Sequence, residues 1–165
     1  MMRIILATRN ISKATQIKSV FKETPIEVVT LTEVGIVGDV VEDTGTLEGN
    51  SLKKARFARD QSGAQEWVMA DDTGLFITEL NGDPGVEAAY WGGKELSVVE
   101  RQNYCLEQMK AVSNREATFR TVVAVISPRG EEHVFAGEVL GRLLEVPPLR
   151  EGDGDLRISA WRRPV

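Results

Sequence analysis

The chain has 165 residues, of which 42% are hydrophobic and 27% are charged, and its formal net charge is −5. This length and composition predict one domain with a single core, spanning residues 1–165. The negative net charge argues against a nucleic-acid-binding module, since such proteins gather phosphates with an excess of Lys and Arg. The start of the chain has no secretory signal pattern, and no apolar run reaches the roughly 18 residues of a membrane span, so a cytoplasmic protein is expected.

Strand-like and helix-like segments alternate in the first part of the chain. In order, they are a strand over residues 3–8, a helix over 13–22, a strand over 27–31 and a helix over 46–61. The helices are predicted from apolar or small residues at helical spacing. Ser12 is the expected N-cap of the first helix, and Gly63 is the expected stop of the second. Residues 32–45 are acidic and contain glycine, which favours a loop.

The remainder of the chain favours strands joined by tight turns. The expected segments are a strand over 67–70 that ends at Asp71, a run over 75–80, a helix over 97–109, and strands over 117–127 and 133–146. Asn81-Gly82 and Pro128-Arg129-Gly130 are turn signals. Cys105 is expected to be a small buried residue of a helix, and His133 a partly exposed strand residue. Strands that alternate with helices and then pair in hairpins predict an α/β fold with a mixed sheet.

Residues 8–13 lie between the first predicted strand and the first predicted helix. Backbone N–H groups at a helix N-terminus favour phosphate, and a lysine one turn inside the helix adds positive charge. The segment lacks the glycines of a Walker A motif. An ordinary loop with a capping serine is the alternative. The candidate phosphate-binding residues are Thr8, Arg9, Asn10, Ile11, Ser12 and Lys13.

Two adjacent carboxylates, Asp71 and Asp72, follow the predicted strand over residues 67–70. Like charges this close repel each other, and burial increases the penalty, so a divalent cation is one way to stabilise them. Mg²⁺ prefers oxygen ligands and commonly takes one or two carboxylates together with substrate phosphates. Glu42, in the acidic segment, is a candidate further ligand, and Lys54 is a candidate phosphate contact. A solvated acidic turn and a charged helix face are the alternatives.

In chain order, these segments resemble the inosine/xanthosine triphosphate pyrophosphatase family. The opening pattern, a strand followed by Thr-x-Asn-x-x-Lys, is met by residues 5–13, and the middle pattern is met by 46–55. The central Ala-Asp-Asp-Thr-Gly-Leu pattern is residues 70–75, and Leu-Asn-Gly-Asp-Pro-Gly-Val follows at 80–86. Residues 135–142 resemble a later glycine-containing strand. The resemblance covers about residues 3–146.

The resemblance implies an elongated α/β fold, in which a twisted mixed sheet is flanked by helices and a central cleft holds the substrate. It implies Mg²⁺-dependent hydrolysis of ITP, dITP and XTP to the monophosphate and pyrophosphate, and commonly a homodimer. Asp72 would be the catalytic residue that activates or positions water. The implied metal ligands are Glu42, Asp71 and Asp72, and the implied substrate contacts are residues 8–13, Lys54 and Thr73.

Three departures from the family pattern leave alternatives open. Gly49 replaces an acidic residue before Asn50, and Tyr90 stands where the family has Arg. Residues 147–165 lack the Gly-Phe-Gly-Tyr-Asp-Pro and Ser-His-Arg segments with which the family holds the purine. This divergent tail is predicted to be a poorly packed terminus, a source of substitute arginines, or the product of a reading-frame change. A pyrophosphatase with another base preference and a homologue that only binds nucleotides are the alternative functions.

Overall fold

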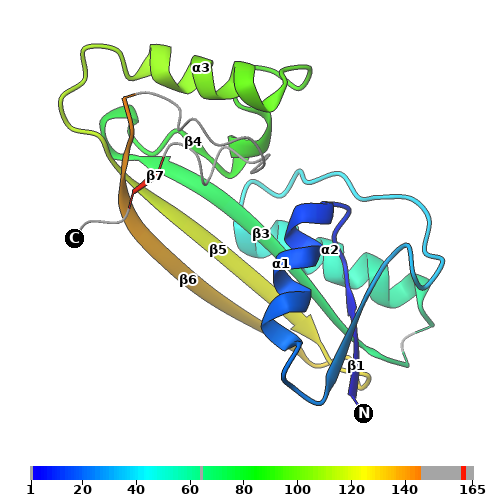
Figure 1. The fold of residues 1–165 in the computed structure, drawn as a ribbon. Helices are drawn as coiled ribbons and strands as arrows, with labels where there is room; N and C mark the ends of the chain where they lie inside the picture. Colours follow the sequence, from blue (N-terminus) through cyan, green and yellow to red (C-terminus); the bar gives the residue numbers. More distant parts are fainter. Residues whose placement is uncertain (1, 64, 146–160, 163–165) are drawn as a thin grey trace. The chain divides into compact units, whose positions relative to one another are not determined.

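The computed structural model describes residues 2–63, 65–145 and 161–162. Within this part of the chain, seven strands form one sheet in the order β2-β1-β3-β5-β6-β7, with β4 paired to β3. The elements are β1 (Met2–Leu6), α1 (Ile11–Phe21), β2 (Ile26–Thr30), α2 (Leu47–Gln61), β3 (Trp67–Ile77), η1 (Thr78–Leu80), β4 (Pro84–Gly85), η2 (Val86–Tyr90), α3 (Val98–Gln108), β5 (Glu116–Ile126), β6 (Glu132–Leu143) and β7 (Trp161–Arg162). β1 is parallel to β2 and β3, whereas β4 is antiparallel to β3 and β7 to β6. The prediction of an α/β fold with a mixed sheet is therefore confirmed (Figure 1).

Residue contacts group the chain into two compact units. The first unit comprises Met1–Asp72 and Val122–Ala136, and the second comprises Thr73–Thr121 and Gly137–Val165. The long strands β3, β5 and β6 therefore each contribute residues to both units. Each unit is described by itself below.

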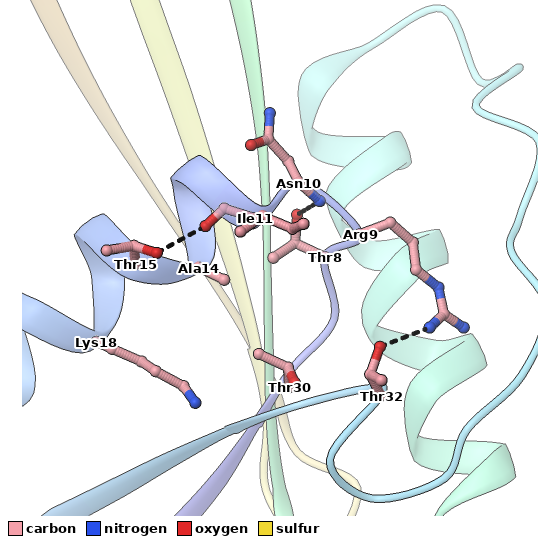
Figure 2. Close-up of a pocket in the computed structure, with 9 residues that line it drawn as sticks. All are labelled: Thr8, Arg9, Asn10, Ile11, Ala14, Thr15, Lys18, Thr30 and Thr32. Atoms are coloured by element: carbon pink, nitrogen blue, oxygen red, sulfur yellow. Dashed lines mark hydrogen bonds between the residues drawn. The ribbon is translucent and has the colours of Figure 1, made fainter. Parts of the chain in front are cut away.

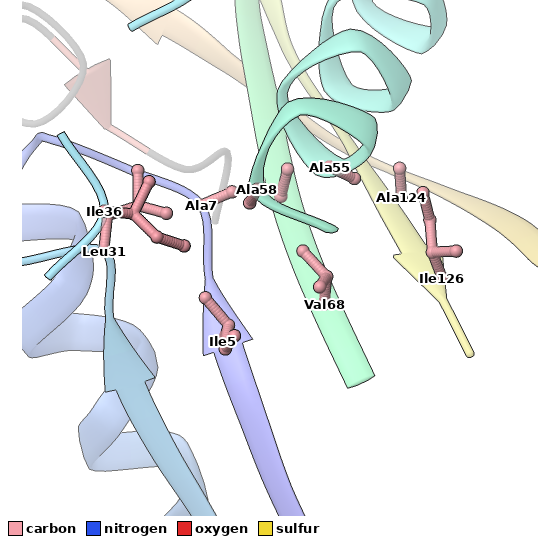
Figure 3. Close-up of a cluster of buried hydrophobic side chains, with 10 residues drawn as sticks. Ile5, Ala7, Leu31, Ile36, Ala55, Ala58, Val68, Ala124 and Ile126 are labelled. Carbon is pink, nitrogen blue, oxygen red and sulfur yellow. The ribbon is translucent and has the colours of Figure 1, made fainter. Parts of the chain in front are cut away.

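In the first unit, helices pack on both faces of the parallel strands. Successive residues of a strand point to opposite faces, so β1 presents one set of side chains to each helix. The α1 face is formed by Ile4, Leu6, Ala14, Val28 and Met69. The α2 face is formed by Ile5, Ala7, Leu31, Ile36, Ala55, Ala58, Val68, Ala70, Ala124 and Ile126 (Figure 3). Burial on both faces explains why these strands have continuous apolar runs and no polar alternation.

The two helices of the first unit begin at side-chain caps. Thr46 caps α2, and its Oγ1 accepts a hydrogen bond from Gly49 N at 3.0 Å. The prediction of Ser12 as the cap of α1 is wrong. Asn10 is the cap, with Oδ1 accepting from Lys13 N at 3.0 Å, because α1 begins at Ile11 and a cap bonds the N–H three residues ahead.

The strand that carries the two aspartates is longer than the sequence predicts. β3 continues from Trp67 through Asp71 and Asp72 to Ile77, so both carboxylates lie inside a strand and not in a turn after it. Gly74 permits the continuation, since a Cβ there would lie 2.7 Å from the carbonyl oxygen of Gly85 in the paired β4. The predicted turn at Asn81-Gly82 is confirmed, with Asn81 in the left-handed region at φ 53°.

The second unit is organised around α3 and its own apolar cluster. Ser97 and Glu100 form a capping box at the start of α3, close to the predicted helix start. Cys105 is buried on α3 as predicted, and burial raises the pKa of its thiol to about 11. The cluster consists of Leu75, Ile77, Ala88, Cys105, Met109, Ala117 and Leu143.

Three further predictions concern the rest of the chain. His133 lies exposed in β6, as predicted. The predicted divergent tail over residues 147–165 lies outside the described residues, apart from the backbone of β7. None of the helices in residues 2–63 and 65–145 combines the length and apolar character needed to cross a membrane.

Candidate functional site

The first unit holds two buried carboxylates, each paired with a lysine from a different helix. Asp71 and Asp72 are both 6% exposed. Lys13, in the first turn of α1, lies with its Nζ 2.6 Å from Asp71 Oδ2. Lys54, in the middle of α2, lies with its Nζ 2.9 Å from Asp72 Oδ1. The ion pairs compensate charges that would be strongly destabilising if they were buried alone.

Strand geometry explains this division. Met69 pairs with Leu6, and β1 ends there, so Asp71 and Asp72 extend beyond the carboxyl end of β1. Adjacent residues of an extended strand point to opposite faces, which directs Asp71 to the α1 side and Asp72 to the α2 side. The strand order reverses next to β1, because β2 lies on one side of β1 and β3 on the other. In open α/β sheets, ligands bind beyond the carboxyl ends of the strands at such a reversal. The repulsion expected between the adjacent carboxylates is therefore reduced in two ways. The two side chains point to opposite faces of the strand, and each is paired with its own lysine.

Glu42 joins the α2 side of this arrangement. Its Oε1 lies 3.2 Å from Lys54 Nζ, and about one third of its side chain, 34%, is exposed. Burial raises the pKa of Glu42, and the nearby Asp72 raises it further, against the opposing charge of Lys54. Burial lowers the pKa of Lys54, but the charges of Asp72 and Glu42 outweigh it, so the Lys54 pKa is raised. One ammonium group thus lies between two carboxylates that compete for it.

Asn50 is a member of this site that we did not single out from the sequence. It is buried in α2, and its Nδ2 donates to Asp72 Oδ2 at 3.2 Å. Its Oδ1 accepts from Thr44 N at 3.2 Å and from Thr44 Oγ1 at 2.7 Å. Asn50 therefore fixes Asp72 and the end of the acidic loop together. The signal was present in the middle sequence pattern, where an Asn precedes Lys54 by one helical turn.

The predicted phosphate-binding segment divides between two places. Lys13 turns to Asp71, whereas other residues of the segment line a cavity of about 340 Å³ beside α1 and the end of β2 (Figure 2). The cavity is lined by Thr8, Arg9, Asn10, Ile11, Ala14, Thr15, Lys18, Thr30 and Thr32. Thr8 Oγ1 accepts from Asn10 N at 3.2 Å, which shapes the start of α1. Ser12 is an exposed residue of α1 and lines neither place.

Thr73, also predicted to contact substrate, belongs to the second unit. Its Oγ1 lies 2.9 Å from Thr121 Oγ1 on β5. As the neighbour of Asp72 on an extended strand, Thr73 points to the opposite face of β3 from that carboxylate.

The three predicted metal ligands do not form one cluster. Among the described residues, no group of three or more Asp, Glu, Cys or His side chains lies ready to hold a metal ion. Glu42 and Asp72 share Lys54, whereas Asp71 points to the α1 side with Lys13. Because adjacent residues of a strand alternate, the carboxylates of Asp71 and Asp72 point to opposite faces of β3. The pair that does converge on one cation is Glu42 and Asp72.

This geometry defines an α/β protein with a charged, oxygen-rich site beyond the carboxyl ends of parallel strands. Such a site suits an anionic ligand held by lysines and a hard cation held by carboxylates. The Ham1 family model matches residues 4–154. The chain therefore belongs to the Ham1 family, and the match extends past residue 146, where the motif resemblance ends.

Curated relatives with this similarity are named dITP/XTP pyrophosphatases. The protein of that name from Caldanaerobacter subterraneus subsp. tengcongensis is 41% identical over 148 residues, covering 87% of this chain and 74% of the relative. The one from Thermoanaerobacter pseudethanolicus is 37% identical over 155 residues, covering 93% of this chain and 77% of the relative.

Solved structures agree with this assignment. A HAM1 protein from Coxiella burnetii matches with a TM-score of 0.83 and 30% identity, over 98% of this chain and 81% of the other. A nucleoside-triphosphatase / dITP/XTP pyrophosphatase from Mycobacterium abscessus matches with a TM-score of 0.77 and 30% identity, over 98% and 84% of the two chains. The predicted α/β fold with a mixed sheet flanked by helices is therefore shared with these solved structures.

Proposed function

We propose that this protein hydrolyses nucleoside triphosphates to the monophosphate and pyrophosphate, with dITP, XTP and ITP as substrates. The observation that carries the proposal is the buried Asp72 carboxylate, held by Lys54 and Asn50 beside Glu42. Relatives named dITP/XTP pyrophosphatase supply dITP and XTP as substrates, and ITP follows from the family resemblance. If these residues served only the stability of the fold, an apolar pair of similar volume would serve as well or better, because a buried ion pair seldom stabilises a protein more than such a pair does.

In this mechanism, the residues of the site act mainly by positioning. Lys13 and Lys54 provide two cations on the two sides of β3. When the triphosphate binds, each ammonium group exchanges part of its contact with an aspartate for a hydrogen bond to a phosphate oxygen. Asp72, freed from Lys54 but still held by Asn50, orients the water that attacks the α-phosphate and accepts its proton. Positioning of this kind provides most of the acceleration in phosphoryl-type transfer.

We also propose that the site takes Mg²⁺. Glu42 and Asp72 fit this ion, because both direct carboxylate oxygens at one cation, the Lys54 ammonium, at 3.2 and 2.9 Å. When bound, Mg²⁺ would neutralise phosphate charge and lower the barrier to attack at phosphorus. Asp71, held by Lys13 on the other side, is proposed as a support for the phosphate-binding lysine. Contacts from Thr8, Asn10 and the Thr73 loop to the substrate and a homodimer stay predictions of the family resemblance. A cytoplasmic location stays a prediction from the lack of a secretory signal pattern.

The proposal is tested by pyrophosphate release from ITP, dITP, XTP, ATP and GTP in the presence of Mg²⁺. We expect release from the first three, and a loss of hydrolysis of about 10²- to 10⁴-fold in Asp72→Asn, which should still fold because Lys54 keeps Glu42 as a partner. Asp43→Asn is the matched control, because Asp43 is an exposed carboxylate in the loop that carries Glu42, and it pairs with Lys53. Near-wild-type turnover in Asp72→Asn would remove Asp72 from the mechanism.

A homologue that binds nucleotides without hydrolysing them is the second candidate. It is favoured by Tyr90, which stands where the family pattern has Arg. Binding of ITP by calorimetry without pyrophosphate release from any of the five triphosphates would support this candidate over the enzyme.

A further inference from the structure

Arg9 has a hydrogen-bonding pattern unlike that of a phosphate contact. It lies in the connection between β1 and α1, and its guanidinium donates to three acceptors on one other segment. Nη2 donates to Ile36 O at 2.8 Å and also to Gly38 O, and Nη1 donates to Thr32 Oγ1 at 3.5 Å. Figure 2 shows the Arg9 side chain extended towards Thr32, away from Thr15 and Lys18.

The segment to which Arg9 donates these hydrogen bonds is the loop that carries Glu42 to the site. Residues 31–46 connect β2 to α2 and contain neither strand nor helix. Apolar packing holds this loop mainly at Ile36, which is 7% exposed. Further along, Val40 is only partly buried, and Val37 and Val41 are 84% and 72% exposed. Gly38 adopts φ 89°, a left-handed turn that directs the chain after Ile36.

The loop therefore depends on polar contacts on either side of Glu42. On one side, the charged Arg9 guanidinium binds the carbonyls of Ile36 and Gly38, and bonds from a charged donor are stronger than neutral ones. On the other side, Asn50 binds Thr44. Between them, Glu42 reaches Lys54 at 3.2 Å.

We infer that Arg9 is a positioning residue for the reaction, which holds the 36–38 turn so that Glu42 lies at the shared cation position beside Asp72. This role replaces the phosphate contact that the sequence predicts for Arg9. The inference rests on the proposed function for its catalytic meaning. The ordering of the loop by Arg9, however, can be measured without turnover.

The first experiment measures loop order by hydrogen exchange in the full-length protein, in the absence of nucleotide. We expect amides within residues 37–44 to exchange about tenfold faster or more in Arg9→Met, and close to wild-type rates to return in Arg9→Lys. Arg56→Met is the matched control, because Arg56 makes a bidentate contact to Glu132 elsewhere in the same unit. Unchanged exchange of residues 37–44 in Arg9→Met would overturn the inference.

The second experiment is a double-mutant cycle of Arg9→Met and Glu42→Gln, followed through kcat, KM and the Mg²⁺ concentration for half-maximal rate. If Arg9 acts through Glu42, Arg9→Met raises the required Mg²⁺ about tenfold in the wild-type background and has little effect in Glu42→Gln. A direct phosphate contact predicts instead an equal rise in KM in both backgrounds, which would overturn the inference. If the wild-type protein releases no pyrophosphate, the proposed function fails, and hydrogen exchange alone decides whether Arg9 orders the loop.

Discussion

The two units of this protein stabilise buried charge in different ways. In the first unit, Asp71 and Asp72 are buried against lysines, and Lys54 is shared with Glu42. Among the described residues of the second unit, the buried charged side chains are arginines that bind backbone carbonyls. Arg101 donates to Trp91 O, Gly93 O and Leu96 O, and Arg115 donates to Met109 O, Leu143 O and Leu144 O.

The difference separates structural charge from charge that is available for chemistry. Arg101 and Arg115 each bind three backbone carbonyl groups, and these bonds fix the loop after Trp91 and the end of β6. The lysines of the first unit bind carboxylates, which are themselves ligands for cations and acceptors of protons. An anionic ligand can compete for these lysines and a metal for these carboxylates, whereas a backbone carbonyl carries no net charge and takes up no proton. Burial of a charge is therefore a weaker sign of a site than the nature of its partner.

The largest effect on stability is expected when the shared cation is removed. In Lys54→Met, the buried Asp72 and the partly buried Glu42 lose their common partner and face each other. We expect a loss of about 3–5 kcal/mol in the free energy of unfolding, or roughly 10 °C in Tm, together with loss of hydrolysis. Urea and thermal unfolding followed by circular dichroism measure this change.

The double variant Lys54→Met/Asp72→Asn is its control. It removes the uncompensated buried charge, so we expect it to recover most of the lost stability while remaining inactive. A double variant as unstable as Lys54→Met would mean that Lys54 stabilises the fold by packing its aliphatic chain and not by its charge.

A smaller effect is expected when a structural arginine is removed from the second unit. Arg115→Met leaves the carbonyls of Met109, Leu143 and Leu144 without the donor that they share. We expect a loss of about 2–3 kcal/mol in the free energy of unfolding, with hydrolysis per folded molecule unchanged. Arg142→Met, at an exposed position of β6, is the control. A fall in kcat of the folded protein beyond twofold would assign Arg115 to the reaction.

Local patterns in the sequence predicted most of the elements of the fold. The spacing of apolar and small residues placed α2 and α3 to within one residue at their starts, because that signal lies within the helix itself. The end of β3 was predicted wrongly, because its continuation through Gly74 depends on pairing with β4 across a turn. A local pattern of Asp-Asp-Thr-Gly does not contain that partner.

The residues of the candidate site were largely predicted, but their partners were not. Lys13, Lys54, Asp71, Asp72 and Glu42 were named from their chemistry and from the family pattern. That Asp71 pairs with one helix and Asp72 with the other follows from strand alternation combined with the winding of the chain, which requires the topology. The roles of Asn50 and Arg9 depend on contacts with a loop that has no regular structure, and sequence periodicity gives no information about such contacts.

The smallest expected effect on stability concerns Glu42 and depends on pH. The pKa of Glu42 is raised in the folded protein, first by burial and then by Asp72, so folding disfavours its ionised form. At low pH the carboxyl is protonated in both states and there is no penalty. As the pH rises through the folded-state pKa of Glu42, the free energy of unfolding of the wild-type protein falls, because ionised Glu42 is disfavoured in the folded state. Glu42→Gln does not ionise and shows no such fall.

Glu42→Gln is therefore expected to be slightly more stable than the wild type at neutral and alkaline pH. The gain should be below about 1 kcal/mol, since 34% of the side chain is exposed and solvent screens its charge. Hydrolysis should fall in the same variant, because the gain in stability comes from the loss of a negative charge that the proposed reaction uses. Unfolding curves of both proteins across pH 4–8 test this, and a variant less stable than the wild type at pH 8 would show that Glu42 serves the fold through Lys54 and not the site.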